Sequence, residues 1–465
     1  MGDARRAFAA TRFTPFWLDD PRRPEPCEAL VHSTTCDLAV VGGGFTGLWT
    51  AFLAKERNPA AEVVLLESQE IGWAATGRNG GFCLASLTHG LSNGLERFPN
   101  EIERLEKLGY ENFEGLQQTL ARYRIDCDFE PTGTLNVALE PYQMEDLRAG
   151  MATAARFGED ALLLDQDQVR AEVASPTYLG GVWTRNGGAV LNPARLAWGL
   201  KAACLSLGVR IHEHSPVVDL RREGRSVKLG TPYGQVQART VALATNAFSP
   251  LLRRIAHYIV PVYDYVLVTE PLTRAQMTAI GWKHRQGLGD NGNQFHYYRL
   301  TADNRILWGG YDAVYHYNNG LRDELDNRPE SFLKLAGHFF TTFPQLEGLR
   351  FSHAWGGAID TCSRFCVFWG RAMDGQVAYA AGYTGLGVGA SRFGAAVLLD
   401  LLSGRETELT RLHFVKSKPV PFPPEPLRYI GIQLTRWSLD QADQHQGRRN
   451  LWLRALDRLG LGYDS

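Results

Sequence analysis

Three glycines near the start of the chain have the spacing of a phosphate-binding turn. Gly42, Gly44 and Gly47 form the pattern G-x-G-x-x-G within the stretch GGGFTG. The first glycine permits a tight turn, the second lets a pyrophosphate approach the backbone, and the third lets helix and strand pack closely. Glu67 follows 20 residues after Gly47, where a carboxylate accepts hydrogen bonds from ribose hydroxyls. The spacing therefore predicts a dinucleotide site.

A strand, a helix and a second strand must position these residues. The run DLAVV at 37–41 predicts a strand directly before the glycines. Leu48, Ala51 and Phe52 recur at helical spacing, and the segment NPA at 58–60 ends that helix. The run EVVLLE at 62–67 has the apolar centre of a parallel strand that is covered on both faces. This context makes the glycine pattern much more specific than it is alone.

A second glycine-rich stretch distinguishes a resident flavin from a passing nicotinamide. The sequence GWAATGRNGGF at 72–82 follows Glu67 within a few residues. A nicotinamide dehydrogenase has no need for such a loop, whereas the flavin end of FAD needs backbone donors and a closely approaching chain. The sequence therefore predicts FAD, and a plain surface turn is the structural alternative.

The rest of the chain alternates between two kinds of pattern. Helix–strand patterns predict a discontinuous α/β domain of Rossmann type from 36–90, 186–250 and 350–405. Short alternating runs predict a sheet-rich substrate domain from 91–185 and 251–349. Residues 1–35 are expected to form an N-terminal arm, and residues 406–465 a proline-rich arm and an amphipathic helix packed on the protein. Within the α/β part, Asn192 followed by Pro193 predicts the start of a helix.

These stretches together resemble the D-amino-acid oxidase superfamily of FAD-dependent oxidoreductases from about residue 36 to 405. Within it, the gamma-glutamylputrescine oxidase branch is most similar, through YVLVTEPL (265–272), YYRLTADNRILWGG (297–310), WGGAIDTCSR (355–364) and AGYTGLGVG (381–389). The resemblance implies a D-amino-acid-oxidase-like fold and oxidation of the C–N bond of a primary or secondary amine by hydride transfer to flavin N5.

The resemblance also assigns cofactor contacts, which fall into four groups. The pyrophosphate turn comprises Gly42, Gly43, Gly44, Phe45, Thr46 and Gly47, and Glu67 is assigned to the adenosine ribose. The flavin loop comprises Thr76, Gly77, Arg78, Asn79, Gly80 and Gly81. Val218 is assigned to the adenine and Asn246 to the end of a strand beside the cofactor. A late loop of Gly385, Leu386, Gly387 and Val388 is assigned to the pyrimidine edge of the flavin, where backbone N–H groups stabilise negative charge on reduction.

Several positions depart from relatives in the superfamily. Asp360 stands where a cysteine holds the flavin covalently in monomeric sarcosine oxidase, and Cys362 lies two residues further on, so noncovalent FAD is expected. Trp308 and Leu386 replace a lysine and a histidine found in relatives, which leaves oxygen or another electron acceptor open. An arginine clamp for an α-carboxylate is replaced by Ile359 or Asp360, which favours a small-molecule amine over an ordinary amino acid.

Three residues are the candidate catalytic groups in the substrate cavity: His296, Tyr298 and Asp360. Strand alternation places His296 and Tyr298 on one face and Tyr297 on the other, so one of the two faces must be plain packing. Asp360 could pair with a distal cationic amine, and a structural carboxylate is an equal alternative. No acid–base constellation stands out, as expected if proximity and electrostatics near the flavin provide most of the catalysis.

Bulk composition narrows the remaining classes. A chain of 465 residues is long enough for two domains, and a formal net charge of −1 gives no field for binding nucleic acid. No apolar run approaches the length of a membrane span. Seven scattered cysteines form neither a disulfide framework nor a metal site, which favours a reducing cytoplasm.

Three alternatives remain at this stage. The first is an amine dehydrogenase or N-demethylase that uses an acceptor other than oxygen. The second is a nicotinamide-dependent dehydrogenase, which the GRNGG loop disfavours. The third is a noncatalytic flavin-binding protein.

Overall fold

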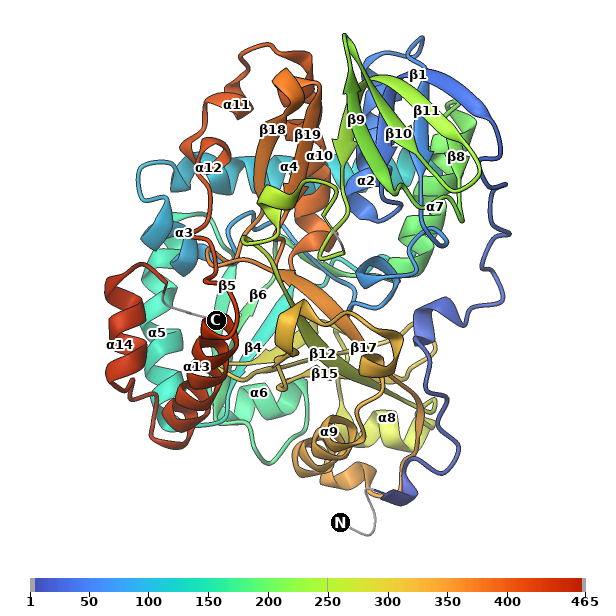
Figure 1. The fold of residues 1–465 in the computed structure, drawn as a ribbon. Helices are drawn as coiled ribbons and strands as arrows, with labels where there is room; N and C mark the ends of the chain where they lie inside the picture. Colours follow the sequence, from blue (N-terminus) through green and yellow to red (C-terminus); the bar gives the residue numbers. More distant parts are fainter. Residues whose placement is uncertain (1–4, 249, 462–465) are drawn as a thin grey trace.

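The computed structural model describes residues 5–248 and 250–461, and two large sheets dominate this part of the chain (Figure 1). The first sheet lies in the upper half of the view and has the strand order β18-β19-β11-β1-β2-β8, with β10 and β9 added beside β11. Its strands are β1 (Ser33–Val41), β2 (Val63–Leu66), β8 (Arg210–His212), β9 (Asp219–Glu223), β10 (Ser226–Gly230), β11 (Gln235–Leu243), β18 (Phe368–Ala372) and β19 (Val377–Ala381).

The centre of the first sheet is parallel. Strand β1 pairs in parallel with both β2 and β11, and β11 pairs in parallel with β19. All four residues of β2 are buried, as expected for a strand covered on both faces. Three segments that are far apart in the sequence therefore build one Rossmann-type sheet, which confirms the predicted fold class.

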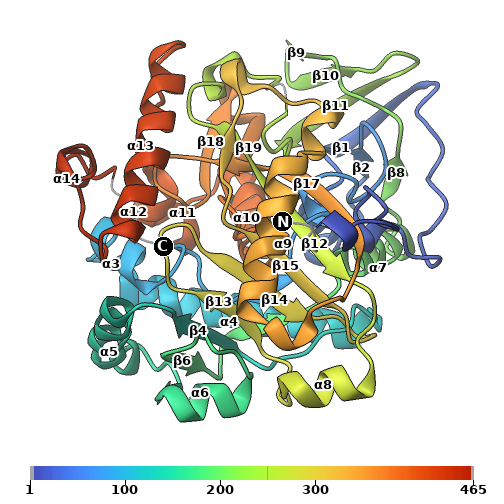
Figure 2. The ribbon, with the colours of Figure 1, turned by 90° about the horizontal axis from the view of Figure 1, so that it is seen from below.

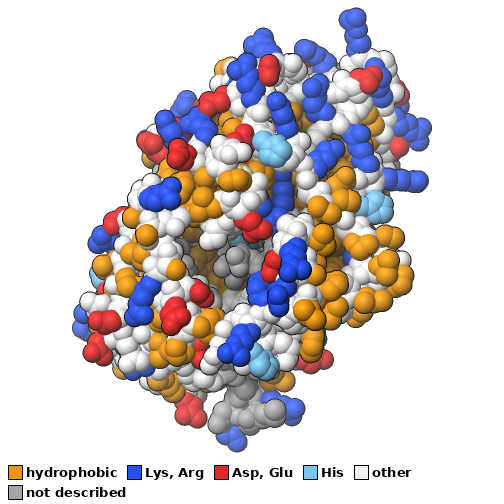
Figure 3. Space-filling view, turned by 90° about the vertical axis from the view of Figure 1, so that its left-hand side faces the viewer, with side chains coloured by type: hydrophobic (Ala, Val, Ile, Leu, Met, Phe, Trp, Pro, Cys, Tyr) orange, Lys and Arg blue, Asp and Glu red, His pale blue; other side chains and the backbone are white. Residues whose placement is uncertain are grey.

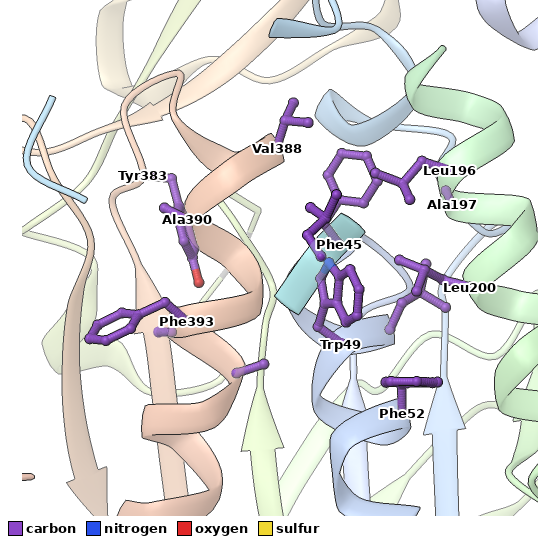
Figure 4. Close-up of a cluster of buried hydrophobic side chains, with 14 of the residues drawn as sticks. Phe45, Trp49, Phe52, Leu196, Ala197, Leu200, Tyr383, Val388, Ala390 and Phe393 are labelled. Carbon is purple, nitrogen blue, oxygen red and sulfur yellow. The ribbon is translucent and has the colours of Figure 1, made fainter. Parts of the chain in front are cut away.

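Three helices pack side by side against this sheet: α2 (Phe45–Arg57), α7 (Pro193–Ser206) and α10 (Gly387–Ser403). As predicted, α7 begins after Asn192, whose side chain accepts a hydrogen bond from the backbone N–H of Arg195. Figure 4 shows the aromatic side chains of α2 between apolar side chains of α7 and α10. The buried Trp49 and Phe52 belong to this cluster, which fixes the direction of α2 relative to the glycine turn at its start.

The second sheet is mostly antiparallel and lies in the lower half of Figure 1. Its order is β16-β12-β15-β14-β13-β4-β6-β5, with β17 beside β12. Its strands are β4 (Thr134–Ala138), β5 (Ala161–Leu164), β6 (Gly180–Thr184), β12 (Val260–Thr269), β13 (Gly287–Asp290), β14 (His296–Leu300), β15 (Ile306–Gly310), β16 (Val314–Tyr315) and β17 (Phe351–Thr361). A separate short sheet pairs β3 (Phe82–Leu84) with β7 (Gly188–Val190).

Strand β17 corrects one of the expected domain ranges. Residues 350–405 were assigned as a block to the nucleotide-binding domain, but β17 pairs along its whole length with β12 of the second sheet. The segment returns to the first sheet only at β18. A long antiparallel pairing therefore carries the chain from one sheet to the other.

Helices surround the second sheet and connect it to the first. Viewed from below, α9 (Pro329–Thr342) lies across β12 and β15 (Figure 2). The other helices of this half and of the junction are α3 (Leu91–Arg97), α4 (Ile102–Tyr123), α5 (Pro141–Arg156), α6 (Gln166–Glu172) and α8 (Arg274–Ile280).

The tail contains more helix than the sequence suggested. Its helices are α11 (Glu408–Arg411), α12 (His413–Lys416), α13 (Leu427–Gln444) and α14 (Leu451–Arg458). Helix α14 corresponds to the expected amphipathic helix, whereas α13 was not anticipated. The two lie side by side at the left of Figure 1.

Candidate functional site

The glycine turn has a backbone that only glycine fits. Gly42 has a φ of +111°, and a Cβ there would lie 2.3 Å from the carbonyl oxygen of Ala244 on the neighbouring segment. A Cβ on Gly47 would lie 1.8 Å from the carbonyl oxygen of Gly42. The chain therefore turns tightly into the start of α2, which carries no acidic residue in its first turn. Gly44, Phe45 and Thr46 at this helix N-terminus line a cavity, and such a position suits an anion such as a pyrophosphate.

Glu67 is held at the end of β2 by several donors. One carboxylate oxygen accepts hydrogen bonds from the Ser68 hydroxyl at 2.8 Å and from the indole N–H of Trp73 at 2.8 Å. The other accepts the backbone N–H of Gly43. The side chain is buried, yet it lines the large cavity described below. This carboxylate is preorganised to accept a hydroxyl group of a bound ribose.

A cavity of about 1430 Å³ opens in front of the glycine turn. This volume exceeds the range of roughly 300–1,000 Å³ typical of small-molecule pockets, so it can hold a large cofactor together with a substrate. Most of the predicted site residues line it: Gly42, Gly44, Phe45, Thr46, Glu67, Thr76, Arg78, Asn79, Gly80, Asn246, Asp360, Gly385, Leu386, Gly387 and Val388. The remaining predicted glycines, Gly43, Gly47, Gly77 and Gly81, lie within the same turns without lining the cavity wall.

The second glycine-rich loop is fixed by tryptophans from distant segments. The indole N–H of Trp17 donates to the carbonyl oxygen of Asn79 at 2.9 Å, and that of Trp355 donates to the carbonyl oxygen of Arg78 at 2.9 Å. The Arg78 guanidinium forms an ion pair with Asp326, while the Asn79 amide bonds within its own turn. The side chains of Arg78 and Asn79 are thus engaged in holding the loop, and both residues line the cavity together with Gly80.

The late loop ends in a second helix N-terminus at the cavity. Leu386 is the N-cap of α10, and the first turn of this helix also carries no acidic residue. Leu386, Gly387 and Val388 all line the cavity. The positive end of α10 can therefore stabilise negative charge on a bound group.

One predicted adenine contact is displaced by a single residue. The Val218 side chain is 65% exposed and lies outside the cavity wall. Its backbone N–H donates to the carbonyl oxygen of Gly230 at 2.9 Å, because the chain is entering the β9–β10 hairpin. Pro216 and Val217 line the cavity instead, which corrects the assignment of Val218.

Two of the predicted catalytic residues face away from the cavity. The hydroxyl of Tyr298 bonds to that of Tyr178 at 2.7 Å within an aromatic cluster that includes Trp308. His296 contacts Asp290 through Nδ1 at 2.6 Å and His338 through Nε2 at 2.9 Å. Neither residue lines the cavity. The two predicted catalytic residues therefore lie on the face of β14 that packs against the rest of the protein.

Tyr297, on the opposite face of the same strand, does line the cavity. Its ring packs against Gly80 of the flavin loop, where a Cβ would lie 2.6 Å from the ring. Its hydroxyl donates to a carboxylate oxygen of Asp264, on β12. The strand alternation was anticipated, but a pattern of period two cannot say which of the two faces meets the cavity.

Burial raises the pKa of Asp264 to about 6, against the hydrogen bond from Tyr297, which lowers it. Burial first, and then the neighbouring Asp264, raise the pKa of the Tyr297 hydroxyl well above its ordinary value. Both residues line the cavity. A carboxylate with a pKa near 6 is ionised at neutral pH and can still accept a proton, as a general base must.

Asp360 lines the cavity with its carboxylate held by the backbone. It accepts the N–H groups of Gly382 at 2.7 Å and Tyr383 at 3.3 Å. Burial raises its pKa to about 6 despite these bonds. The contacts match the structural alternative, in which Asp360 fixes the turn after β19 beside the late loop.

The C-terminal helices form part of the cavity wall, which sequence patterns did not indicate. Arg428, Leu434 and Arg436 of α13 and Trp452 of α14 all line it. Figure 3 views the side of the molecule that carries these helices; hydrophobic side chains gather there beside basic ones, and the surface is hollowed. No helix in the described part of the chain is long and apolar enough to cross a membrane, and no cluster of potential metal ligands occurs within 5–248 and 250–461.

Two helix N-termini and the buried carboxylate of Glu67 share one large cavity, an arrangement typical of a dinucleotide-binding protein. Residues 37–401 match the family model of the FAD dependent oxidoreductases, and the chain belongs to that family. This confirms the predicted superfamily and the cofactor FAD.

Relatives and solved structures agree with this assignment. The chain is 34% identical to the gamma-glutamylputrescine oxidoreductase of Escherichia coli, over 86% of this chain and 90% of that protein. It is 28% identical to a probable oxidoreductase, OrdL, of Haemophilus influenzae, over 87% of this chain and 91% of that protein. The crystal structure of glycine oxidase from Geobacillus kaustophilus superposes with a TM-score of 0.70 at 19% identity, covering 83% of this chain and 99% of that one.

Proposed function

We propose that this chain oxidises the C–N bond of a primary or secondary amine to an imine, with molecular oxygen as the electron acceptor. The observation that carries the proposal is the Tyr297–Asp264 pair, which places a proton acceptor on the cavity wall against the flavin loop. The similarity to gamma-glutamylputrescine oxidoreductase supports an amine as the reducing substrate. The resemblance to the D-amino-acid oxidase superfamily supports oxygen.

The cavity wall fits FAD at each part of the cofactor. The start of α2 would receive the pyrophosphate and Glu67 the ribose. The backbone of 76–81 would line the isoalloxazine, and the start of α10 would face its pyrimidine edge. When bound, FAD supplies the acceptor for the two electrons and the hydrogen that leave the substrate carbon as a hydride, at its N5.

The residues of the chain control the proton of the substrate. An amine must lose its ammonium proton before its carbon can lose a hydride, because only the neutral nitrogen has a lone pair to form the C=N bond. We assign the proton to Asp264 Oδ2, reached through the hydroxyl of Tyr297. Hydrolysis of the released imine then requires no residue of the cavity.

The contacts of Cys362 favour noncovalent FAD. Its Sγ lies at 3.2 Å from the carbonyl oxygen of Cys366 and at 3.3 Å from that of Gly382, and burial raises the pKa of its thiol. A thiol that is protonated and already donating is a poor nucleophile. Asp360 itself has no sulfur to form the bond that a cysteine would make.

The proposal is tested with the purified holoenzyme under argon. We expect a yellow protein whose flavin absorbance is bleached by at least one of putrescine, gamma-glutamylputrescine or an N-methyl amino acid. Admitting air should then restore the absorbance with release of peroxide. Bleaching that air does not reverse would transfer the proposal to a dehydrogenase or N-demethylase with another acceptor. A flavin that no amine reduces would refute amine oxidation.

A further inference from the structure

Arg436 has a buried donor that no group within 5–248 and 250–461 satisfies. The residue lies on α13, and its side chain lines the cavity. Its Nη1 donates to Gln433 Oε1 at 3.1 Å, one turn earlier on the same helix. Its Nε is buried and has no hydrogen-bond partner among the residues that the structure describes. An unsatisfied charged donor is costly, so its position on a cavity wall indicates that a ligand completes it.

The acidic residues near Arg436 have other partners. Asp312 accepts from the Ser331 hydroxyl at 2.6 Å and from Lys334 Nζ at 2.7 Å. Asp440, one turn later on α13, accepts from the side-chain amide of Gln444 at 2.9 Å. In the part of the chain that the structure describes, no carboxylate forms an ion pair with Arg436. Its charge is therefore available to an incoming anion.

The surrounding charges make this end of the cavity basic. Burial lowers the pKa of the nearby His316, and Arg328, Arg322 and Arg436 lower it further, which places several positive charges around one site. Arg428 lies about two turns before Arg436 on α13 and also lines the cavity. It donates a hydrogen bond to Asn319 Oδ1 at 2.9 Å. The Tyr297–Asp264 pair lies on β14 and β12 and these two arginines lie on α13, so different elements of one cavity wall carry the acidic and the basic groups.

We propose that Arg436 binds a carboxylate carried by the substrate at the end remote from the oxidised amine. This inference rests on the proposed function and narrows it to amines with a distal anionic group. A guanidinium presents its N–H donors in a planar fork that matches a carboxylate, and such charge-assisted bonds are stronger than neutral ones. The C-terminal helix then selects the substrate, while the sheets perform the reaction.

The competing explanation is that Arg436 only covers apolar surface with its alkyl stem. The two explanations differ in how the guanidinium affects the affinity for a ligand that ends in a carboxylate and for one that ends in a neutral group. A packing role predicts that acid and neutral ligands are affected alike by a substitution. A recognition role predicts that only the acid is affected.

The experiment measures binding to the oxidised holoenzyme by titration calorimetry, with ligands that cannot be oxidised at an amine. The acids are N-butylsuccinamate, N-butylglutaramate and N-butyladipamate, and each methyl ester is the matched neutral ligand. The variants are Arg436→Met, which keeps much of the stem, and Arg436→Lys, which keeps the charge but not the fork. Arg454→Met, on the exposed face of α14, is the control.

We expect at least one acid to bind the wild type more tightly than its ester, with an affinity that falls as salt is added. Arg436→Met should weaken that acid by about 10- to 100-fold and leave the ester unchanged. Arg436→Lys should fall between, and Arg454→Met should match the wild type. No preference for any acid in the wild type, or equal loss of acid and ester in Arg436→Met, overturns the proposal.

The outcome is separable from the test of amine oxidation. Because these ligands have no amine to oxidise, a preference for the acid that depends on Arg436 can be measured even if no amine reduces the flavin. Conversely, Arg436→Met loses carboxylate binding but keeps the groups proposed for amine oxidation. Amines without a carboxylate should therefore reduce its flavin as they reduce that of the wild type.

Discussion

Individual residues around the cavity divide into those that hold the backbone and those that face the substrate. Asp360 accepts two backbone N–H groups, and Arg78 pairs with Asp326, so both stabilise turns. Tyr297 and Asp264 instead present a hydroxyl and a carboxylate to the cavity. Acid–base chemistry is therefore expected from a tyrosine–aspartate pair, although the sequence offered a histidine one residue away.

The pH dependence of flavin reduction tests Asp264. Burial raises the pKa of this carboxyl to about 6. Its ionised form accepts the proton, so the rate of flavin reduction should rise with pH through about 6 in the wild type. Asp264→Asn should lower the rate by about 10²–10⁴-fold and abolish this limb. The measurement is anaerobic stopped-flow reduction between pH 5 and 9.

The variant Tyr297→Phe distinguishes the role of the Tyr297 hydroxyl, which passes the proton on, from that of Asp264, which accepts it. It keeps the ring against Gly80 and removes only the hydroxyl. We expect slower reduction and a limb that moves to higher pH, because Asp264 remains but loses the hydrogen bond that lowers its pKa. If Asp264→Asn keeps a wild-type pH profile, the assignment of the base is wrong.

The carboxyl of Asp264 makes folding stability fall with rising pH, whereas it makes the rate of flavin reduction rise. Its folded pKa lies above the ordinary value of 3.8, so the folded state binds more protons than the unfolded state between about pH 4 and 6. This favourable contribution is complete below pH 3.8 and is lost as the pH rises through 6. Activity should therefore increase over the range in which Asp264 makes folding less favourable.

Among the elements, the turn between β1 and α2 is the most constrained. Gly47 lies in the first turn of α2, where an added Cβ would lie 1.8 Å from a backbone oxygen that cannot move independently. Gly47→Ala should displace the turn, weaken FAD binding by at least about tenfold and destabilise the fold by about 1–3 kcal/mol. FAD fluorescence on reconstitution and thermal unfolding measure the two effects.

Gly150→Ala is the matched control, since Gly150 also lies inside a helix, α5, and nothing lies within 4 Å of its added Cβ. It should bind FAD normally and gain up to about 1 kcal/mol of stability, because alanine is the better helix former. Equal behaviour of the two variants would show that the turn tolerates a side chain.

At the scale of the whole molecule, the cavity exists because two sheets and the C-terminal helices enclose it. Residues from β1, β12 and α13 all contribute to its wall. A ligand bound by so many segments stabilises only the folded state. Removing FAD should therefore lower the unfolding temperature. Adding free FAD back at about 100 times its dissociation constant should raise the free energy of unfolding by about 2.7 kcal/mol. Calorimetry of apoprotein and holoprotein over a range of FAD concentrations measures this; a transition independent of FAD would contradict binding within the fold.

The sequence by itself determined the nucleotide-binding half. Gly42, Gly47 and Glu67 are recognisable because the backbone of a tight turn and the end of a parallel strand impose residue types at fixed spacing. Local patterns also gave the start of α7 and the alternation along β14, since caps and strand periodicity depend on neighbouring residues alone.

Tertiary structure decided which face of each element meets the cavity. Tyr297 rather than His296 and Tyr298 lines it, Val217 rather than Val218 lines it, and β17 joins the second sheet. Arg436 reaches the same cavity from a helix that the sequence did not single out. These features depend on contacts between segments that are far apart in the sequence. Because packing between distant elements fixes them, no local periodicity or spacing can express them.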